Sequence, residues 1–479
     1  MANKRLARRD FLRLSAGATA GALLASCAPP EVVEVVQTVE VEKVVEVERT
    51  VEVEREVAVT AAPARDVLEL PNAATGVPYE LKSSVNHGDP IEIDYWEWAL
   101  DRADYEKGWA QEYMSLYPNV TINVVTQGWD DHFTKMAVSA PAGQGPAFFH
   151  MHTNELTSFC EGGLMDPMPD WVASQGFLNE HWFGFAEGAF DCPGTPGTGK
   201  RYFIPMGAQL PVLLINRRLW EEAGLTDADV PKTWEQMRDV AKALTKYDSA
   251  GRIMQTGLQA NWSRLYKDAL LQQGRYLYNA EATKIQLDNE ESYRTMELIN
   301  NLFNEDKVID PEFPELVEAF SSELAAIIWE ESWIVSTIQR NNPDLDFFVA
   351  LTPTFTGEMA PSVGHMHFAV EAIVNAYASP DVKDVAWDFW HFLYSNDERL
   401  VHDIALRNGM LPSYRKLQSH PAVQANPVAS TLVPGMEYGV IVGETPGFYY
   451  DTITNLIIQP VLLQGESIQN AIAQGEAEV

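Results

Sequence analysis

Two histidine pairs in the chain could bind a metal ion. The sequence reads His-Met-His at residues 150–152 and again at residues 365–367. Residues two apart on a β-strand point to the same face, so each pair would present two imidazoles together. Imidazole nitrogen is a common ligand of Zn²⁺. A metal ion is therefore one alternative for what the protein binds.

A glycine-rich segment comes close to a phosphate-binding loop. Residues 194–200 read Gly-Thr-Pro-Gly-Thr-Gly-Lys. A phosphate loop requires Ser or Thr after the lysine, an apolar strand before the glycines and a helix after them. Here Arg201 follows the lysine, no clear apolar strand precedes the segment, and an extended stretch follows it. We expect no nucleotide site and no cofactor.

Catalytic signatures are missing from the sequence. It contains no Gly-x-Ser-x-Gly, no His-Glu-x-x-His and no cysteine beside a local histidine-bearing signature. A glycosidase needs only two carboxylates, which 68 acidic residues readily supply, so a secreted glycosidase stays the less favoured alternative. We expect no enzyme and no catalytic residue.

The two cysteines of the folded region leave two alternatives open. Cys160 and Cys192 could form one disulfide or remain two buried thiols.

The N-terminus carries two export signals in order. Five basic residues lie between positions 4 and 13, and small and apolar residues follow up to position 26, as in a signal peptide. Arg-Arg-Asp-Phe-Leu at residues 8–12 resembles the twin-arginine export motif. Leu-Ala-Ser-Cys at residues 24–27 resembles a lipobox, in which Cys27 receives the lipid. We expect twin-arginine export and an extracytoplasmic protein anchored to the cell membrane by lipid on Cys27.

Residues 27–84 are predicted to form a stalk and linker. From Val39 to Glu56 the chain repeats Val-Glu-Val-Glu with a period of six residues. An even period places Val on one face of an extended chain and does not match a heptad. The segment is predicted to be a solvated charged stalk, with self-association of the Val faces as the alternative.

Composition limits the partners and the size of the fold. The chain has 479 residues, with 34 Lys and Arg against 68 Asp and Glu and a formal net charge of −34. Binding to nucleic acid requires basic surface, so no nucleic-acid partner is expected. Electrostatic docking on an anionic membrane is disfavoured for the same reason. The apolar content of 46% can fill large cores and indicates two or three domains or two large lobes.

Periodicity predicts alternating strands and helices. Residues 91–95 and 120–124 alternate apolar and polar side chains, and Tyr105, Trp109, Tyr113 and Leu116 recur between them at helical spacing. This order predicts a βαβ unit with parallel strands.

Later segments repeat the pattern. Residues 212–216 read as a buried strand, and residues 219–223 as a short helix with Gly224 just after its end. Thr233 to Gln236 fits a capping box, and Ser379-Pro380 fits an N-cap followed by a first-turn proline. The fold class predicted from these elements is α/β.

Several segments together resemble the extracellular solute-binding proteins of ABC importers, of the maltose-, multiple-sugar- and glycerol-phosphate-binding type. The resemblance covers residues 88–479, and Pro-Ala at 146–147 and Ile215 depart from the family's usual Pro-Asp and Tyr. The segments that carry it are Gly-Lys-Arg-Tyr-Phe-Ile-Pro (199–205), Leu-Ile-Asn-Arg-Arg-Leu (214–219), Glu-Ala-Gly-Leu (222–225), Pro-Lys-Thr-Trp (231–234), Glu-Ser-Trp (331–333), Trp-Asp-Phe-Trp-His-Phe-Leu (387–393) and Asn-Gly-Met-Leu-Pro (408–412).

The resemblance implies a two-lobed fold of the type II periplasmic-binding-protein kind, with the ligand in a cleft between the lobes. One lobe is expected to comprise residues 85–208 and 374–436, and the other residues 209–373 and 437–479. The chain is expected to cross between them near residues 206–210, 368–373 and 435–444.

The resemblance also implies a function. A monomer would capture a sugar or oligosaccharide by lobe closure and deliver it to the permease subunits of an ABC transporter, without making or breaking a bond. Other small solutes stay open as alternatives, namely a glycerol phosphodiester, a polyamine or a metal ion. Zinc importers use a differently built fold with a rigid connecting helix, which disfavours the metal.

Sugars offer apolar C–H faces and a rim of hydroxyls, so aromatic rings and fixed polar groups at the ends of strands are the expected ligand contacts. The predicted ligand-binding residues are Trp98, Trp129, Asp131, His152, Asn154, Gln209, Trp262, Trp333, His365 and Tyr449.

Overall fold

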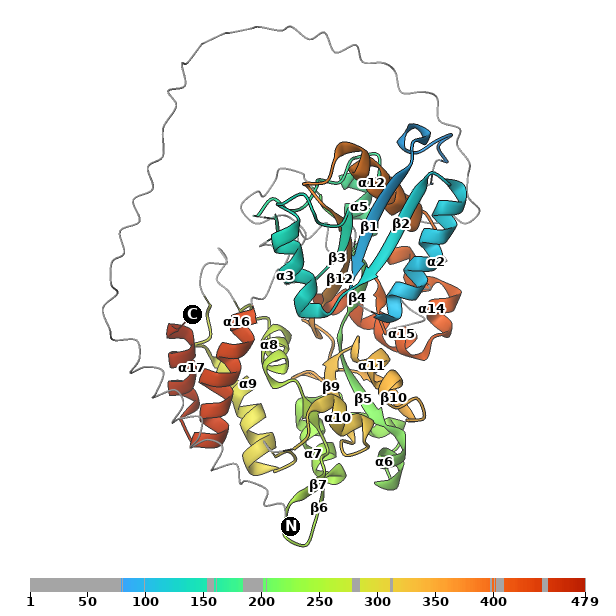
Figure 1. Cartoon of the computed structure of the whole chain (residues 1–479). Coiled ribbons are helices and arrows are strands. Elements are labelled where there is room, and N and C mark those ends of the chain that lie inside the picture. Colours follow the sequence, from blue (N-terminus) through green and yellow to red (C-terminus); the bar gives the residue numbers. More distant parts are fainter. Residues whose placement is uncertain are drawn as a thin grey trace, which may run out of the picture. The chain divides into compact units, whose positions relative to one another are not determined.

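The architecture is known from a computed structural model (Figure 1). The signal peptide, the stalk, Cys27 and Cys192 lie outside the described residues. Within the described part of the chain, no helix combines the length and the apolar content needed to cross a membrane. The structure describes residues 79, 81–98, 100–152, 159–160, 162–183, 201–203, 205–277, 285–310, 313–396, 399, 401, 409–441 and 447–478.

A six-stranded mixed sheet organises the first lobe (Figure 1). Its strands, in spatial order, are β13 (Leu411–Pro412), β4 (Pro205–Gln209), β12 (His367–Val374), β3 (Phe148–His152), β1 (Ile91–Glu97) and β2 (Val120–Thr126). β1 runs parallel to β2 and β3, whereas β12 runs antiparallel to β3 and β4. Helix α2 (Leu100–Leu116) connects β1 to β2, which confirms the predicted βαβ unit.

Helices pack around this sheet, and their ends follow local sequence signals. The side chain of Ser379 accepts a hydrogen bond from the backbone N–H of Val382, and Pro380 occupies the first turn, as predicted. The helices after α2 in this part of the chain are α3 (Trp129–Ser139), α5 (Gln175–His181), α12 (Pro380–Tyr394), α14 (Pro421–Ala425) and α15 (Pro427–Leu432). Short 3₁₀ turns cover Asn86–Gly88, Arg415–Ser419 and Val433–Tyr438.

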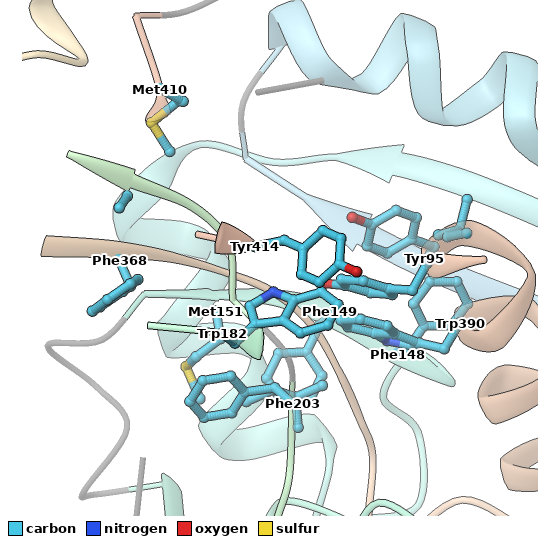
Figure 2. Packing of buried hydrophobic residues seen from close by; sticks show 14 of the residues in the cluster. Tyr95, Phe148, Phe149, Met151, Trp182, Phe203, Phe368, Trp390, Met410 and Tyr414 are labelled. Atoms are coloured by element: carbon cyan, nitrogen blue, oxygen red, sulfur yellow. The ribbon is translucent and has the colours of Figure 1, made fainter. Parts of the chain in front are cut away.

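The core of the first lobe is rich in aromatic side chains (Figure 2). Tyr95 stacks on Phe148 with ring centroids 4.4 Å apart, and Trp182 stacks on Tyr414 at 4.3 Å. Such pairs add stabilisation beyond the apolar area that they bury.

The buried face of α2 differs from the predicted stripe. Tyr113 is buried, but Tyr105 and Leu116 are 36% and 37% exposed. Glu106 takes a buried position because it accepts a hydrogen bond of 2.6 Å from the Tyr95 hydroxyl and lies 3.6 Å from Arg102. A paired carboxylate can therefore replace an apolar side chain on the helix face that the periodicity assigned to the core.

A four-stranded sheet organises the second lobe. In spatial order its strands are β10 (Phe347–Leu351), β5 (Pro211–Asn216), β9 (Ile327–Glu331) and β8 (Gln259–Ala260). β8 is parallel to β9, and the other neighbours are antiparallel. All six residues of β5 are buried, as the continuous apolar run predicted. Val212 and Leu214 belong to one core cluster and Leu213 and Ile215 to another, so both faces of the strand are covered.

Helices from distant parts of the sequence cover this sheet. Both hydrogen bonds of the predicted capping box at Thr233 and Gln236 are present, and Gly224 follows α6 with φ +76°. C-terminal helix α17 packs against α9 from the middle of the chain (Figure 1). The helices are α6 (Arg217–Glu222), α7 (Trp234–Leu244), α8 (Trp262–Gln272), α9 (Glu290–Asn300), α10 (Leu316–Ser321), α11 (Ile334–Asn341), α16 (Gly447–Thr452) and α17 (Ile468–Ala477). A 3₁₀ turn covers Asp227–Asp229, and π-helical segments cover Asn301–Glu305, Ile453–Ile458 and Pro460–Gln464.

The chain passes from the first sheet to the second at a single residue, and it returns to the first sheet from a separate two-stranded sheet. Leu210 separates β4 from β5, and Met366 separates the short strand β11 (Gly364–His365) from β12. β11 pairs with β14 (Gly439–Val440), which lies within the third range expected for a crossing. Residues 368–373, the second range expected for a crossing, belong to β12. A further hairpin of the second lobe joins β6 (Lys246–Tyr247) to β7 (Ile253–Gln255).

Candidate functional site

A cavity of about 570 Å³ opens where two strands of the second sheet end. β8 and β9 run parallel, so the residues that follow them meet at the same edge of the sheet. Asn261 and Trp262 follow β8, and Trp333 follows β9 after Ser332. All of these except Ser332 line the cavity. The topology therefore brings two of the predicted ligand-binding tryptophans to one site.

Local structure fixes these side chains. Asn261 is the N-cap of α8 and accepts a hydrogen bond from the backbone N–H of Arg264 at 3.3 Å. Trp262 opens the helix and meets Phe303 edge to face, with ring centroids 5.1 Å apart. Trp262, Phe303 and Trp333 are each half-buried, so their rings are supported by the protein but not fully covered. Such rings can stack on an apolar ligand face.

The polar lining of the cavity is acidic. Glu330, near the end of β9, is only 4% exposed, and Asp310 and Glu315 are exposed at the rim. Among the described residues that line the cavity, none is Lys, Arg or His. Burial raises the pKa of Glu330, and this effect is opposed by the nearby Arg264. Asn261 donates a hydrogen bond of 3.2 Å to Glu330, so the two side chains form one polar patch.

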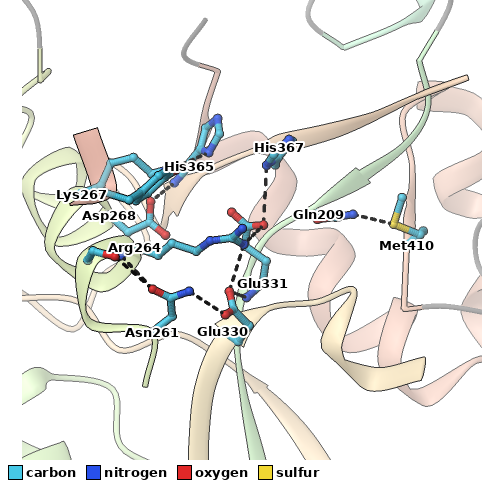
Figure 3. Close-up of polar contacts among 12 residues, drawn as sticks. Gln209, Asn261, Arg264, Lys267, Asp268, Glu330, Glu331, His365, His367 and Met410 are labelled. Atoms are coloured by element: carbon cyan, nitrogen blue, oxygen red, sulfur yellow. Dashed lines mark hydrogen bonds and ion pairs between the residues drawn. The ribbon is translucent and has the colours of Figure 1, made fainter. Parts of the chain in front are cut away.

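Behind this patch lies a group of charged and histidine side chains, here termed the crossing cluster (Figure 3). All of its members are buried except Arg264, which is half-buried. It lies where β9, α8 and the passage from β11 to β12 meet. Its members are Arg264, Lys267, Asp268, Glu331, His365 and His367.

Hydrogen bonds and charge pairs hold the cluster together. Arg264 donates to Glu331 at 2.6 Å, and Glu331 lies 3.6 Å from the Nδ1 atom of His367. The Lys267 ammonium lies 2.9 Å from the Nδ1 atom of His365, and Asp268 accepts from the backbone N–H of His365 at 3.1 Å.

Burial determines the protonation of the cluster. It lowers the pKa of both histidines, and the adjacent cations reinforce the shift at His365. It raises the pKa of Asp268 to about 7 despite the neighbouring Lys267. Burial also opposes ionisation of Glu331, but Arg264 and His367 hold the pKa of that carboxyl well below its usual range.

One group of side chains among the described residues could coordinate a metal ion. It consists of Glu331, His365 and His367, whose potential ligand atoms all lie within 4.8 Å of one another. Two positively charged side chains of the protein already contact these potential ligand atoms. Arg264 is bonded to the carboxylate, and Lys267 lies against one imidazole. A divalent ion would have to displace both positive charges in a buried setting, where repulsion between like charges is strong. The donor set therefore fits a metal poorly.

Comparison with known proteins gives the family. Residues 100–399 match the family model described as bacterial extracellular solute-binding protein, which is more than half of the chain. The chain belongs to this family. The resemblance recognised in the sequence is thereby confirmed.

Relatives of this solute-binding protein are distant in sequence. The maltotriose-binding protein of Pyrococcus abyssi is 22% identical over 338 residues, which are 70% of this chain and 69% of that protein. The diacetylchitobiose-binding protein DasA of Streptomyces coelicolor is 20% identical over 362 residues, which are 71% of this chain and 78% of that protein.

Solved structures establish the fold. The ABC substrate-binding protein Lmo0181 from Listeria monocytogenes, in complex with cycloalternan, has a TM-score of 0.65 at 20% identity, over 81% of this chain and 98% of that chain. The maltose/maltodextrin-binding domain MalE from Bdellovibrio bacteriovorus, bound to maltotriose, has a TM-score of 0.61 at 20% identity with the same coverage. The predicted two-lobed α/β fold is confirmed.

Two further predicted ligand residues of this solute-binding protein lie at the passages between the sheets. Gln209 ends β4, is 9% exposed and donates to the sulfur of Met410 at 3.1 Å (Figure 3). His365 belongs to the crossing cluster and is 5% exposed. Neither lines the cavity.

Trp98 and Asp131, two predicted residues of the first lobe, do not line the cavity. Trp98 is half-buried, and one face stacks on His150 with centroids 3.8 Å apart. Asp131 is exposed on α3 and lies 3.3 Å from Lys135. Trp129 begins α3 and His152 ends β3, but their side chains, like all of Asn154, lie outside the described residues.

Tyr449 differs from its predicted position at the ligand. It belongs to α16 and is fully buried in the core of the second lobe, so a solute could reach it only if that core opened. The next residue, Tyr450, turns the other way. Its hydroxyl accepts a hydrogen bond from Lys267 at 3.0 Å. Helical geometry places neighbouring side chains about 100° apart, so a one-residue error moves a ring from the surface to the core.

Sequence reasoning missed the polar partners of the two tryptophans. Asn261 could have been found, because an asparagine directly before a helical Trp is an N-cap signal next to a candidate ligand residue. Glu330 could not have been found, because its role depends on the pairing of β8 with β9.

Of the two alternatives left open for Cys160, the structure has the disulfide: Cys160 is disulfide-bonded.

Proposed function

We propose that this protein is the extracellular carbohydrate-binding component of an ABC importer. The observation that carries the proposal is the joint placement of Trp262 and Trp333 with Asn261 and Glu330 around one cavity. The rings can stack on the C–H faces of a sugar. The Asn261 amide can donate hydrogen bonds to its hydroxyls or accept them, and the Glu330 carboxylate can accept hydrogen bonds from them. The names of the relatives, which include maltotriose and diacetylchitobiose binding, support the same class of solute.

Lobe closure would link solute binding to recognition by the permease subunits. A solute that contacts both lobes only when they approach stabilises the closed state, and the permease subunits then recognise that state. We propose that the lobes meet at Leu210 and near Met366. At Leu210 the support is that β4 and β5 belong to different sheets, and near Met366 it is that β12 of the first sheet follows directly after the separate strand β11. The protein acts as a monomer, makes no bond and breaks none.

The charge of the cavity narrows the choice of solute. A glycerol phosphodiester or another anionic sugar would meet Glu330, Asp310 and Glu315 with no basic side chain among the described lining residues. Such a solute is disfavoured. A neutral saccharide and a cationic polyamine meet no such repulsion, and the thermal-shift screen described next separates the two. Metal ions are disfavoured by the two cations of the crossing cluster.

A thermal-shift screen tests the class of solute. We expect at least one of maltotriose, maltotetraose and diacetylchitobiose to raise the melting temperature by about 2–4 °C at 100 times its dissociation constant. Glucose 6-phosphate, spermidine and Zn²⁺ serve as comparisons and should leave it unchanged. A shift with spermidine or Zn²⁺ and with no saccharide would reject the carbohydrate. Chromatography of the same mixtures should show no cleavage, whereas turnover would indicate a glycosidase.

The route to the membrane is also a proposal. The twin-arginine-like and lipobox-like segments support export in the folded state and a lipid anchor on Cys27, with residues 27–84 as the tether. Cys27→Ser should shift the protein from the membrane fraction to the soluble extracytoplasmic fraction without altering its melting temperature, as measured by fractionation and immunoblotting. A variant that stays membrane-bound would contradict lipid attachment at this residue.

A further inference from the structure

Leu210 joins β4 to β5, and His367 begins β12. Both of these residues contact the end of β9 or the residue that follows it. The backbone N–H of Ser332 donates to the carbonyl of Leu210 at 2.9 Å. His367, the first residue of β12, is paired in register with Gln209, the last residue of β4. Its Nδ1 atom also lies 3.6 Å from Glu331. A movement at the end of β9 would therefore reach the strands of the first lobe.

Arg264 lies between the cavity and these passages (Figure 3). One of its terminal nitrogens, Nη1, donates to Glu330 at 3.1 Å and to Glu331 at 2.6 Å. Glu330 lines the cavity, whereas Glu331 does not. Glu331 is instead buried against His367, with 2% of its side chain exposed. One guanidinium thus joins a residue of the cavity wall to a residue of the passage.

Sharing one nitrogen between two carboxylates makes the two contacts interdependent. In a buried setting each charge-assisted hydrogen bond is strong, and a change in the charge of one acceptor alters the attraction of the donor to the other. A solute hydroxyl that donates to Glu330 would offset part of its charge. Arg264 would then bind Glu331 more strongly, which changes how firmly Glu331 holds His367.

We propose that Arg264 is a positioning residue that couples occupancy of the cavity to the orientation of β12, and so to lobe closure. The coupling rests on the proposed function, since it needs a solute in the cavity. The neighbouring Tyr450 ring, whose centroid lies 6.0 Å from the guanidinium carbon, helps to hold Arg264 in place.

The test measures binding and closure separately. Maltotriose is the probe, calorimetry gives its affinity, and small-angle X-ray scattering gives the change in radius of gyration on binding. Arg264→Met should melt cooperatively and bind maltotriose about tenfold or more weakly, and it should lose the decrease in radius of gyration. Arg264→Lys keeps the charge and should restore part of the decrease. Arg275→Met is the matched control, because Arg275 pairs with Glu291 at 3.2 Å and lies outside both the cavity and the cluster.

The outcomes separate this inference from the proposed function. A folded Arg264→Met protein that contracts on binding as the wild type does overturns the coupling. Wild-type protein that binds maltotriose without contracting also overturns it and leaves carbohydrate binding intact. Wild-type protein that binds no saccharide contradicts both proposals. If Arg264→Met does not fold, Glu331→Gln carries the same test, since it keeps the shape of the side chain and removes the charge that Arg264 and His367 share.

Discussion

Tryptophans of the second lobe fall into two groups by burial. Trp220, Trp234 and Trp329 are at most 2% exposed and fill the core, whereas Trp262 and Trp333 are half-buried at the cavity. A fully buried ring stabilises the fold but cannot meet a solute, whereas a half-buried ring can do both. Both tryptophans line the cavity, and their contact with a solute stays a prediction. Tyr449 is buried in the core instead, because nothing in the sequence determines which of two adjacent tyrosines faces the core.

His132 offers a test at the residue scale. Its Nε2 atom lies 2.6 Å from the carbonyl oxygen of His150, and burial lowers its pKa to about 4. An unfolded histidine titrates near 6.5, so the unfolded chain binds a proton between about pH 6.5 and 4 that the folded protein does not. The contribution of His132 to the free energy of unfolding therefore decreases as the pH falls through this window.

His132→Gln removes the titration but keeps an amide that can donate to the same carbonyl. Between pH 7 and pH 4 the wild type should lose roughly 2 to 3 kcal/mol more of its free energy of unfolding than the variant does. Urea denaturation at a series of pH values measures the difference. Parallel pH profiles for the two proteins would contradict a buried neutral histidine at this position.

At the scale of elements, signals that act within a few residues were the most predictive. The capping box at Thr233, the Ser379-Pro380 helix start and Gly224 after α6 all occur as expected, because each depends on hydrogen bonds or backbone angles within one turn. The pairing of β8 with β9 has no such local signal. That pairing assembles the cavity, so Glu330 could not be assigned to it before the sheet order was known.

Gly257 tests how tightly the elements around the second sheet pack. A Cβ at this position would lie 1.9 Å from the backbone oxygen of Ala241 in α7. Gly257→Ala should therefore reduce the free energy of unfolding by about 3 kcal/mol or more, because helix backbone has to move. Gly108→Ala in α2 is the control, since nothing lies within 4 Å of its Cβ position. It should raise stability by about 0.5–1 kcal/mol. Equal denaturation midpoints for the two variants would contradict this packing.

At the scale of the molecule, acidity and fold have separate roles. The formal net charge of −34 disfavours nucleic acid as a partner but does not identify a solute, since charge spread over a surface mainly favours solubility. The two-lobed fold was predictable because many weak motifs occur in one order over most of the chain. The relation between cavity and passages was not, because Arg264 acquires its two carboxylate partners only when α8 packs beside β9.

Calorimetric titration of the wild type and Trp333→Ala with a saccharide that raises the melting temperature tests the central claim most directly. Tyr377→Ala, which removes an exposed ring outside the cavity, is the matched control. We expect one saccharide per wild-type molecule and unchanged binding in the control. In Trp333→Ala we expect an affinity reduced about fivefold or more, because a lost stacking ring costs at least ~1 kcal/mol. Equal affinity of folded Trp333→Ala and wild type, or no binding by either, would contradict carbohydrate binding at this cavity.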